Sequence, residues 1–189
     1  MDSVERTVRI LLVSGSLRDR STSTAALRTA ARIAPSGIEA IIYEGLAELP
    51  AFNPDDDGDR LPAAASALRA AIRDADAVVL STPEYAGALP GSFKNLLDWT
   101  IGDDQPGSIY QKPVAWINVA PSGAVDAHDS LRKVLSYAMA DVVTPGCLNV
   151  PISHSMVNAT GVVSDLDARA ILVAALQAIA DHVRRRRSG

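Results

Sequence analysis

A short segment near the N-terminus, residues 14–24, is unusually rich in hydroxyl side chains. It reads Ser-Gly-Ser-Leu-Arg-Asp-Arg-Ser-Thr-Ser-Thr. Hydroxyls, the backbone N–H groups at the start of a helix and a guanidinium are the donors that bind phosphate oxygens in proteins. A helix cap in a solvated turn is the alternative, but one serine or threonine would satisfy that need. The composition of this segment therefore predicts a phosphate-binding loop.

A second segment, residues 81–91, combines two prolines with two glycines before a helical pattern. It reads Ser-Thr-Pro-Glu-Tyr-Ala-Gly-Ala-Leu-Pro-Gly. Such a stiff loop, with unusual backbone angles available at its glycines, can hold main-chain N–H and C=O groups against a flat ring. Tyr85 adds a large amphipathic ring at the mouth of such a site. A rigid turn whose following helix packs as core is the alternative, and it leaves residues 83–87 unexplained.

A third segment, residues 120–124, reads Ala-Pro-Ser-Gly-Ala. Its small side chains let backbone N–H groups approach the edge of a bound ring, although a plain strand-to-helix turn would look the same. We expect donors of this kind to stabilise negative charge that builds up on a ligand, as in an oxyanion site.

Patterns for several other chemistries do not occur. The chain has neither GxxxxGK[ST], the loop of nucleotide triphosphatases, nor the GxGxxG loop of dinucleotide folds. His128, His154 and His182 show no metal-ligand spacing, so we predict no metal, and we expect His128 on a helix surface. Cys147 is the only cysteine, which excludes an intramolecular disulfide and favours a packing role.

The three segments each follow an apolar run that reads as a strand. We expect strands at 8–13, 38–43, 77–81, 114–119 and about 147–150, with helices at 23–34, 63–74, 92–99, about 127–140 and from 165 onward. Runs that are apolar on both faces, alternating with helices, predict an α/β flavodoxin-like three-layer sandwich with a five-stranded parallel sheet. Ligands of such sheets bind beyond the carboxyl ends of the strands, where the three segments lie.

Length and composition fit one globular domain. We expect a single domain over residues 1–189, with a core at about 7–183, a long functional or mobile loop at 44–61 and a basic tail at 184–189.

The net charge is −4 although Arg184 to Arg187 form a basic run, which we expect to end a helix and fray into water. An acidic body argues against nucleic-acid binding. No apolar run is long enough to cross a membrane and no signal peptide is visible, so a reducing cytoplasm is expected.

Two motifs in this order resemble the NADPH-dependent FMN reductase family, whose members include quinone, azo-dye and chromate reductases. They are Gly15-Ser16-Leu17-Arg18-x-x-Ser21, and Pro83-Glu84-Tyr85 followed by Pro90-Gly91-x-x-Lys94-Asn95-x-x-Asp98-Trp99. The resemblance covers about residues 7 to 150. It implies that FMN is the cofactor and that NADPH or NADH is the co-substrate.

The resemblance also implies where FMN would lie. The residues it places at the cofactor are Ser16, Leu17, Arg18, Ser21, Thr22, Ser23, Pro83, Glu84, Tyr85, Ala86, Gly87, Ser122 and Gly123. The first loop would hold the phosphate, the second would line the ribityl chain and isoalloxazine, and the third would face the pyrimidine edge. Ser23 and Ala86 stand where the family often has asparagine, so their roles are less secure.

Three functions remain to be separated. An FMN-dependent oxidoreductase would pass a hydride from nicotinamide to FMN and on to a quinone, flavin, azo or metal-oxyanion acceptor, with no catalytic side chain of its own. A flavodoxin-type electron carrier is the alternative. Carriers enclose the flavin between aromatic rings, whereas only 4% of this chain is aromatic, which favours an open site and the enzyme. A nucleotide-binding module without turnover is the third. The resemblance further implies a homodimer or homotetramer.

Overall fold

The computed structural model describes residues 6–189. Five strands form the main sheet in the order β2-β1-β3-β4-β5, and β6 pairs with β4 beyond the end of β5. Their bounds are β1 Val8–Ser14, β2 Ile38–Tyr43, β3 Ala77–Ser81, β4 Pro113–Asn118, β5 Asp141–Val142 and β6 Leu148–Asn149. All the pairs between these strands are parallel. The predicted flavodoxin-like fold is confirmed.

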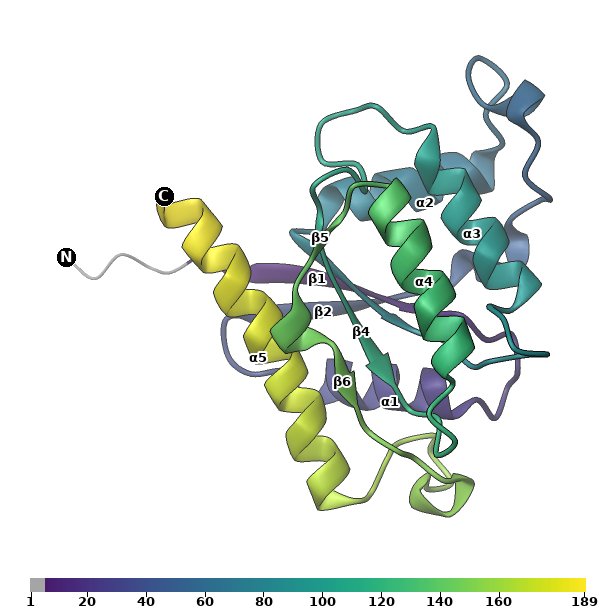
Figure 1. Cartoon of the computed structure of the whole chain (residues 1–189). Coiled ribbons are helices and arrows are strands. Elements are labelled where there is room, and N and C mark those ends of the chain that lie inside the picture. Colours follow the sequence, from purple (N-terminus) through teal and green to yellow (C-terminus); the bar gives the residue numbers. More distant parts are fainter. Residues whose placement is uncertain (1–5) are drawn as a thin grey trace.

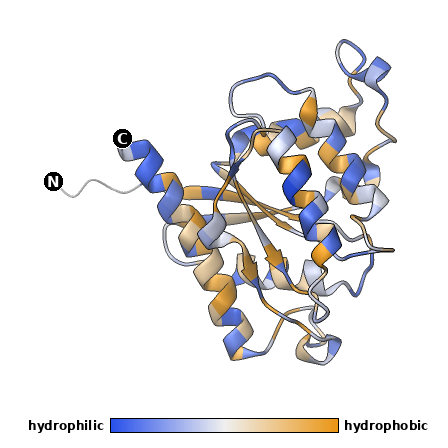
Figure 2. Ribbon diagram, in the orientation of Figure 1, coloured by the Kyte–Doolittle hydropathy of each residue, from blue (hydrophilic) through white to orange (hydrophobic). Residues whose placement is uncertain are grey.

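Helices cover both faces of the sheet, as the sequence predicts (Figure 1). They are α1 Thr22–Arg32, α2 Ala63–Asp74, α3 Gly91–Ile101, α4 Val125–Tyr137 and α5 Leu166–Ser188. One apolar cluster joins the sheet to α1 and α5, and the other joins it to α2, α3 and α4. Figure 2 shows the same segregation, with apolar residues gathered on the strands and on the inward sides of the helices. Because β1, β3 and β4 are covered twice, their residues are buried almost throughout.

The last strand differs from the prediction. We expected one strand near 147–150, but a 3-10 turn at Thr144–Gly146 divides this region. β5 pairs with the beginning of β4, and β6 pairs with its end. Pro145 lies in the turn, where its missing N–H and fixed φ interrupt the ladder.

The C-terminal arginines also differ from the prediction, because they do not fray. Helix α5 continues through Ser188. Arg186 lies 2.9 Å from Asp141, and Arg187 lies 2.6 Å from Asp76. His182 contacts the same Asp141 carboxylate at 2.7 Å. These contacts tie the end of α5 to the amino-terminal edge of the sheet, opposite to the edge where the three loops emerge.

The long segment 44–61 packs against α2 and α3 and contains two 3-10 turns, Gly45–Glu48 and Pro54–Asp56. Two side chains of α3 hold it. Asn95 Nδ2 and Trp99 Nε1 both donate to the Pro50 carbonyl at 2.8 Å, and Phe52 N donates to Asn95 Oδ1 at 2.7 Å. The motif residues Asn95 and Trp99 are therefore explained by this clamp rather than by contact with a cofactor.

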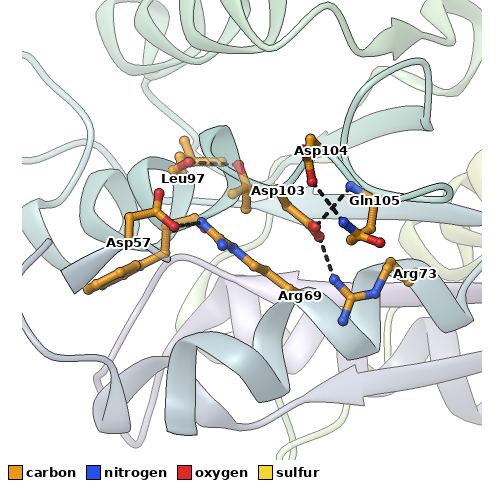
Figure 3. A network of polar contacts seen from close by, with 9 residues as sticks. Asp57, Arg69, Arg73, Leu97, Asp103, Asp104 and Gln105 are labelled. Atoms are coloured by element: carbon orange, nitrogen blue, oxygen red, sulfur yellow. Dashed lines mark hydrogen bonds and ion pairs between the residues drawn. The ribbon is translucent and has the colours of Figure 1, made fainter. Parts of the chain in front are cut away.

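A buried ion pair holds the acidic end of the same segment (Figure 3). Arg69 of α2 is only 6% exposed, and its Nη2 atom lies 2.8 Å from Asp57 Oδ1. The Nε atom of Arg69 donates to the Trp99 carbonyl at 2.8 Å. Gly102 is required beside this pair, because a Cβ atom there would overlap the Asp57 carboxylate. One turn further along α2, Arg73 binds Asp103 at 2.8 Å.

We predict that Asp57→Asn lowers the free energy of unfolding by about 3 kcal/mol or more, because it leaves the Arg69 charge buried without a counter-charge. Urea denaturation measures this change. Asp56→Asn is the matched control, since Asp56 pairs with Arg60 at 3.7 Å with both side chains exposed, and surface pairs contribute about 0–1 kcal/mol. Equal losses in the two variants would contradict the prediction.

Candidate functional site

The three loops come together because their strands are neighbours in the sheet. β1 lies between β2 and β3, and β3 lies beside β4. Ser14 is in register with Ser81, and Gly15 N donates to the Ser81 carbonyl at 2.8 Å. Ser81 Oγ in turn donates to the Ile117 carbonyl of β4 at 2.8 Å. The starts of the loops are thus bonded to one another across the carboxyl edge of the sheet.

The first loop makes an extended turn before α1. Ser21 is the N-cap, and its hydroxyl accepts from Thr24 N at 3.3 Å. Ser14 Oγ and Thr24 Oγ1 lie 2.8 Å apart and brace the loop from inside. Gly15 is required, because a Cβ atom there would come within 3 Å of Thr82 and Phe93. Sequence reasoning gave Gly15 no individual role, because this close approach depends on the fold.

The expected phosphate ligands fall into an exposed or partly exposed first group and a buried second group. Leu17 and Arg18 are exposed, and Ser16 and Thr22 are partly exposed. Ser21 is 9% exposed and Ser23 only 2% exposed. A phosphate at this helix N-terminus can be reached by the first group and by backbone N–H groups of the first turn. The burial of the Ser23 side chain leaves it poorly placed for a contact of its own.

The second loop contains a two-residue hairpin from Tyr85 to Ala88. Tyr85 N donates to the Ala88 carbonyl at 3.0 Å, and Ala88 N donates back to Tyr85 at 3.1 Å. Ala86 has φ 51° and Gly87 has φ 69°, the left-handed angles of a type I′ turn. Asn-Gly is the preferred pair for such a turn, because asparagine tolerates this conformation better than alanine does. The family often has asparagine at this position, and an asparagine there would favour the turn conformation as well as make any contact with a ligand. Ala86 adopts the same backbone angles in this chain.

Glu84 links the second loop to the third. Its Oε2 atom accepts from Ala127 N, in the first turn of α4, at 3.0 Å. The N-cap position of α4 is Ala124, which has no side-chain acceptor of its own, so Glu84 supplies the missing cap. The resemblance implies that Glu84 also lines the ligand, and this remains a prediction beside the positioning role of its carboxylate. The hairpin is thereby fixed against the start of α4.

The third loop is braced by Asn118, the last residue of β4. Its Nδ2 atom donates to the Gly123 carbonyl at 2.6 Å, and its Oδ1 atom accepts from Ala120 N at 3.0 Å. Gly123 and Ala124 both have positive φ, of 91° and 42°. Gly123 N donates to the Ala120 carbonyl and is therefore occupied. Within the described residues, the backbone N–H of Ser122 has no internal acceptor, so it can face a ligand.

Two other candidates from the sequence are buried or half-buried. The expectation that His128 lies on a helix surface is wrong, because it is 8% exposed and packs near Trp116. Its Nδ1 atom lies 2.8 Å from the Ala124 carbonyl. Cys147 is half-buried, and burial raises the pKa of its thiol. Cys147 packs against both apolar clusters, and a raised pKa disfavours the reactive thiolate, which is consistent with the predicted packing role.

The architecture and the loops at one edge of the sheet define a flavodoxin-like protein. The model of the NADPH-dependent FMN reductase family matches residues 8–155. The chain is 31% identical to an NAD(P)H-dependent FMN reductase of Pseudomonas aeruginosa over 183 residues, covering 95% of this chain and 97% of that protein. It is also 31% identical to a quinone reductase of Escherichia coli K12, with 94% and 96% covered.

A solved structure agrees with these relatives. The flavoenzyme NAD(P)H:(acceptor) oxidoreductase FerB from Paracoccus denitrificans superposes with a TM-score of 0.76 at 25% identity, over 95% of this chain and 98% of that one. The chain belongs to the NADPH-dependent FMN reductase family. It is therefore an oxidoreductase that uses FMN as cofactor and NAD(P)H as co-substrate, and the electron-carrier alternative is not favoured.

We predict that Glu84→Ala lowers the free energy of unfolding by about 1–3 kcal/mol, because a charge-assisted hydrogen bond to the start of α4 is lost. FMN affinity should fall with it, since the second and third loops are no longer held together. Glu84→Gln should retain most of both quantities, because its amide oxygen can still accept from Ala127 N. Chemical denaturation and FMN titration of both variants measure these effects. An alanine variant that matches the native protein in both would contradict the positioning role.

Proposed function

We propose that FMN binds across the three loops, with its phosphate at the first, and that it passes electrons from NAD(P)H to a quinone. The observation that carries this proposal is the convergence of the three loops at one sheet edge through Gly15, Ser81 and Glu84. FMN held there would supply the hydride acceptor, its N5 atom, and the negative charge of the reduced ring would lie at N1 and C2=O. The relative named a quinone reductase supports a quinone as acceptor.

The protein residues then have binding and positioning roles. The Ser16 hydroxyl, the Arg18 guanidinium and the N–H groups that begin α1 would hold the phosphate dianion. The backbone N–H of Ser122 and the amino-terminal end of α4 would face the pyrimidine edge, where a helix dipole favours negative charge. Tyr85, 47% exposed at the hairpin, would border an otherwise open face on which nicotinamide and quinone take turns.

Two wider assignments belong to the same proposal. We infer that residues 1–189 act as one FMN-binding domain, since the family match contains the whole sheet and α5, which follows the match, packs on that sheet. The described residues contain no helix long and apolar enough to cross a membrane. A cytoplasmic location is supported by the requirement for NAD(P)H and by the single half-buried cysteine.

The test is anaerobic addition of NADPH to the FMN-loaded protein, followed by absorbance. We predict that the bound flavin bleaches in one phase and that a quinone restores its colour. Arg18→Ala should weaken FMN binding about ten- to hundredfold while affecting riboflavin much less, because riboflavin lacks the phosphate. Absence of bleaching with either nicotinamide would overturn the proposed function. Equal loss for FMN and riboflavin would overturn the role of Arg18.

We propose that the chain forms at least a homodimer through an apolar surface between α3 and α4. Ile101, Tyr110, Tyr137 and Met139 are all exposed there, with Tyr137 at 89%, around a hollow of about 520 Å³. Exposed apolar residues gathered in this way are typical of a protein interface. Tyr137→Glu should shift sedimentation toward a smaller species. Leu166→Glu is the matched control, because Leu166 is 78% exposed but lies at the start of α5 outside this surface. An unchanged sedimentation profile for Tyr137→Glu would contradict the proposed interface.

A further inference from the structure

A cavity of about 540 Å³ lies beside the first loop, between α1 and the segment that precedes α5. One wall is a face of α1 formed by Ser21, Ala25 and Arg28, which are spaced by four and three residues. The other wall is the segment 154–161. Ser21 is also the N-cap of α1, so the cavity adjoins the second half of the predicted phosphate loop. None of the contacts described for the flavin loops uses the second wall.

The two walls are held in place by buried hydrogen bonds. Val163 N donates to Thr29 Oγ1 at 2.9 Å, and Thr29 Oγ1 donates to the Ala25 carbonyl at 2.7 Å. The turn that lines the cavity is organised by Asn158, whose Oδ1 atom accepts from Thr160 N at 3.0 Å and from Val162 N at 3.1 Å. The cavity is therefore preformed rather than dependent on a mobile segment.

The charges that line this cavity are predominantly positive. Arg20 and Arg28 line it, against one carboxylate from Asp19, and the imidazole of His154 lies on the opposite wall. Within the described residues, neither Arg20 nor Arg28 makes an ion pair or a side-chain hydrogen bond. The buried Arg69 and the partly buried Arg73 of this acidic protein are paired with carboxylates. Two guanidiniums without carboxylate partners on one cavity are suited to a phosphate monoester, which they bind through parallel N–H bonds.

We propose that this cavity binds the 2′-phosphate end of NADPH and so sets a preference for NADPH over NADH. The proposal rests on the proposed function, in which nicotinamide stacks on FMN at the adjoining loops. The two nicotinamide cofactors differ only by this phosphate, so a pocket that binds it discriminates between them. The FMN phosphate is assigned to donors around Ser16 and Arg18. Ser21 borders both places, whereas Arg28 and the segment 154–161 are not among the FMN donors.

The experiment compares the steady-state kinetics of FMN-loaded Arg28→Ala with those of the native protein, using NADPH and NADH. The ratio of kcat/KM for NADPH to that for NADH should fall about ten- to hundredfold, through a higher KM for NADPH. Arg32→Ala is the matched control. It removes the same charge from an exposed position one turn further along α1, outside the cavity, and should keep the native ratio.

A second measurement uses binding instead of turnover. Adenosine 2′-monophosphate should compete with NADPH and bind more tightly than adenosine 5′-monophosphate, and Arg28→Ala should abolish this difference. Equal changes in kcat/KM for NADPH and NADH would overturn the proposal. So would a native protein that binds inorganic phosphate as tightly as adenosine 2′-monophosphate without competition from NADPH. If neither nicotinamide reduces the native protein, the proposed function fails, while calorimetry with adenosine 2′-monophosphate still decides whether the cavity binds this phosphate.

Discussion

The burial of three adjacent parallel strands is the constraint on which the rest of the structure depends. β1, β3 and β4 are covered by helices on both faces, so their residues must be apolar on both sides and their backbone groups must be paired laterally. Because these strands are parallel, all three end at the same edge of the sheet. Polar residues are excluded from these buried strands and lie in the loops that follow them. The three loops therefore form one polar site at this edge.

Each loop at that edge is fixed by its own side chains before any ligand binds. Ser14 and Thr24 brace the first loop, Glu84 ties the second to α4, and Asn118 holds the third. Groups used in this way are no longer available for a ligand, and the remaining donors are backbone N–H groups and a few exposed side chains. A cofactor that brings its own redox chemistry needs such fixed geometry more than it needs a reactive residue.

Much of this arrangement could be predicted from local pattern. Apolar runs on both faces located four strands closely, and the density of hydroxyls marked the first loop. The divided fifth strand was missed because two-residue pairings such as Asp141–Val142 leave too short an apolar signal. The burial of His128 was missed because a polar residue on an amphipathic helix is normally assigned to the outer face. The roles of Gly15 and Glu84 depend on atoms more than 40 residues away, which periodicity does not report.

The distribution of arginines makes the electrostatic field of this protein uneven, although its net charge is −4. At the amino-terminal edge of the sheet, Arg186 and Arg187 are neutralised by Asp141 and Asp76. At the carboxyl edge, Arg18, Arg20 and Arg28 lie on or near the start of α1 without carboxylate partners among the described residues. An unpaired guanidinium keeps its full field and all its hydrogen-bond donors for a ligand, whereas a carboxylate partner cancels much of the field and occupies some of the donors. Because the start of α1 adds its own positive partial charge, the attraction of anions is local and does not require a basic protein.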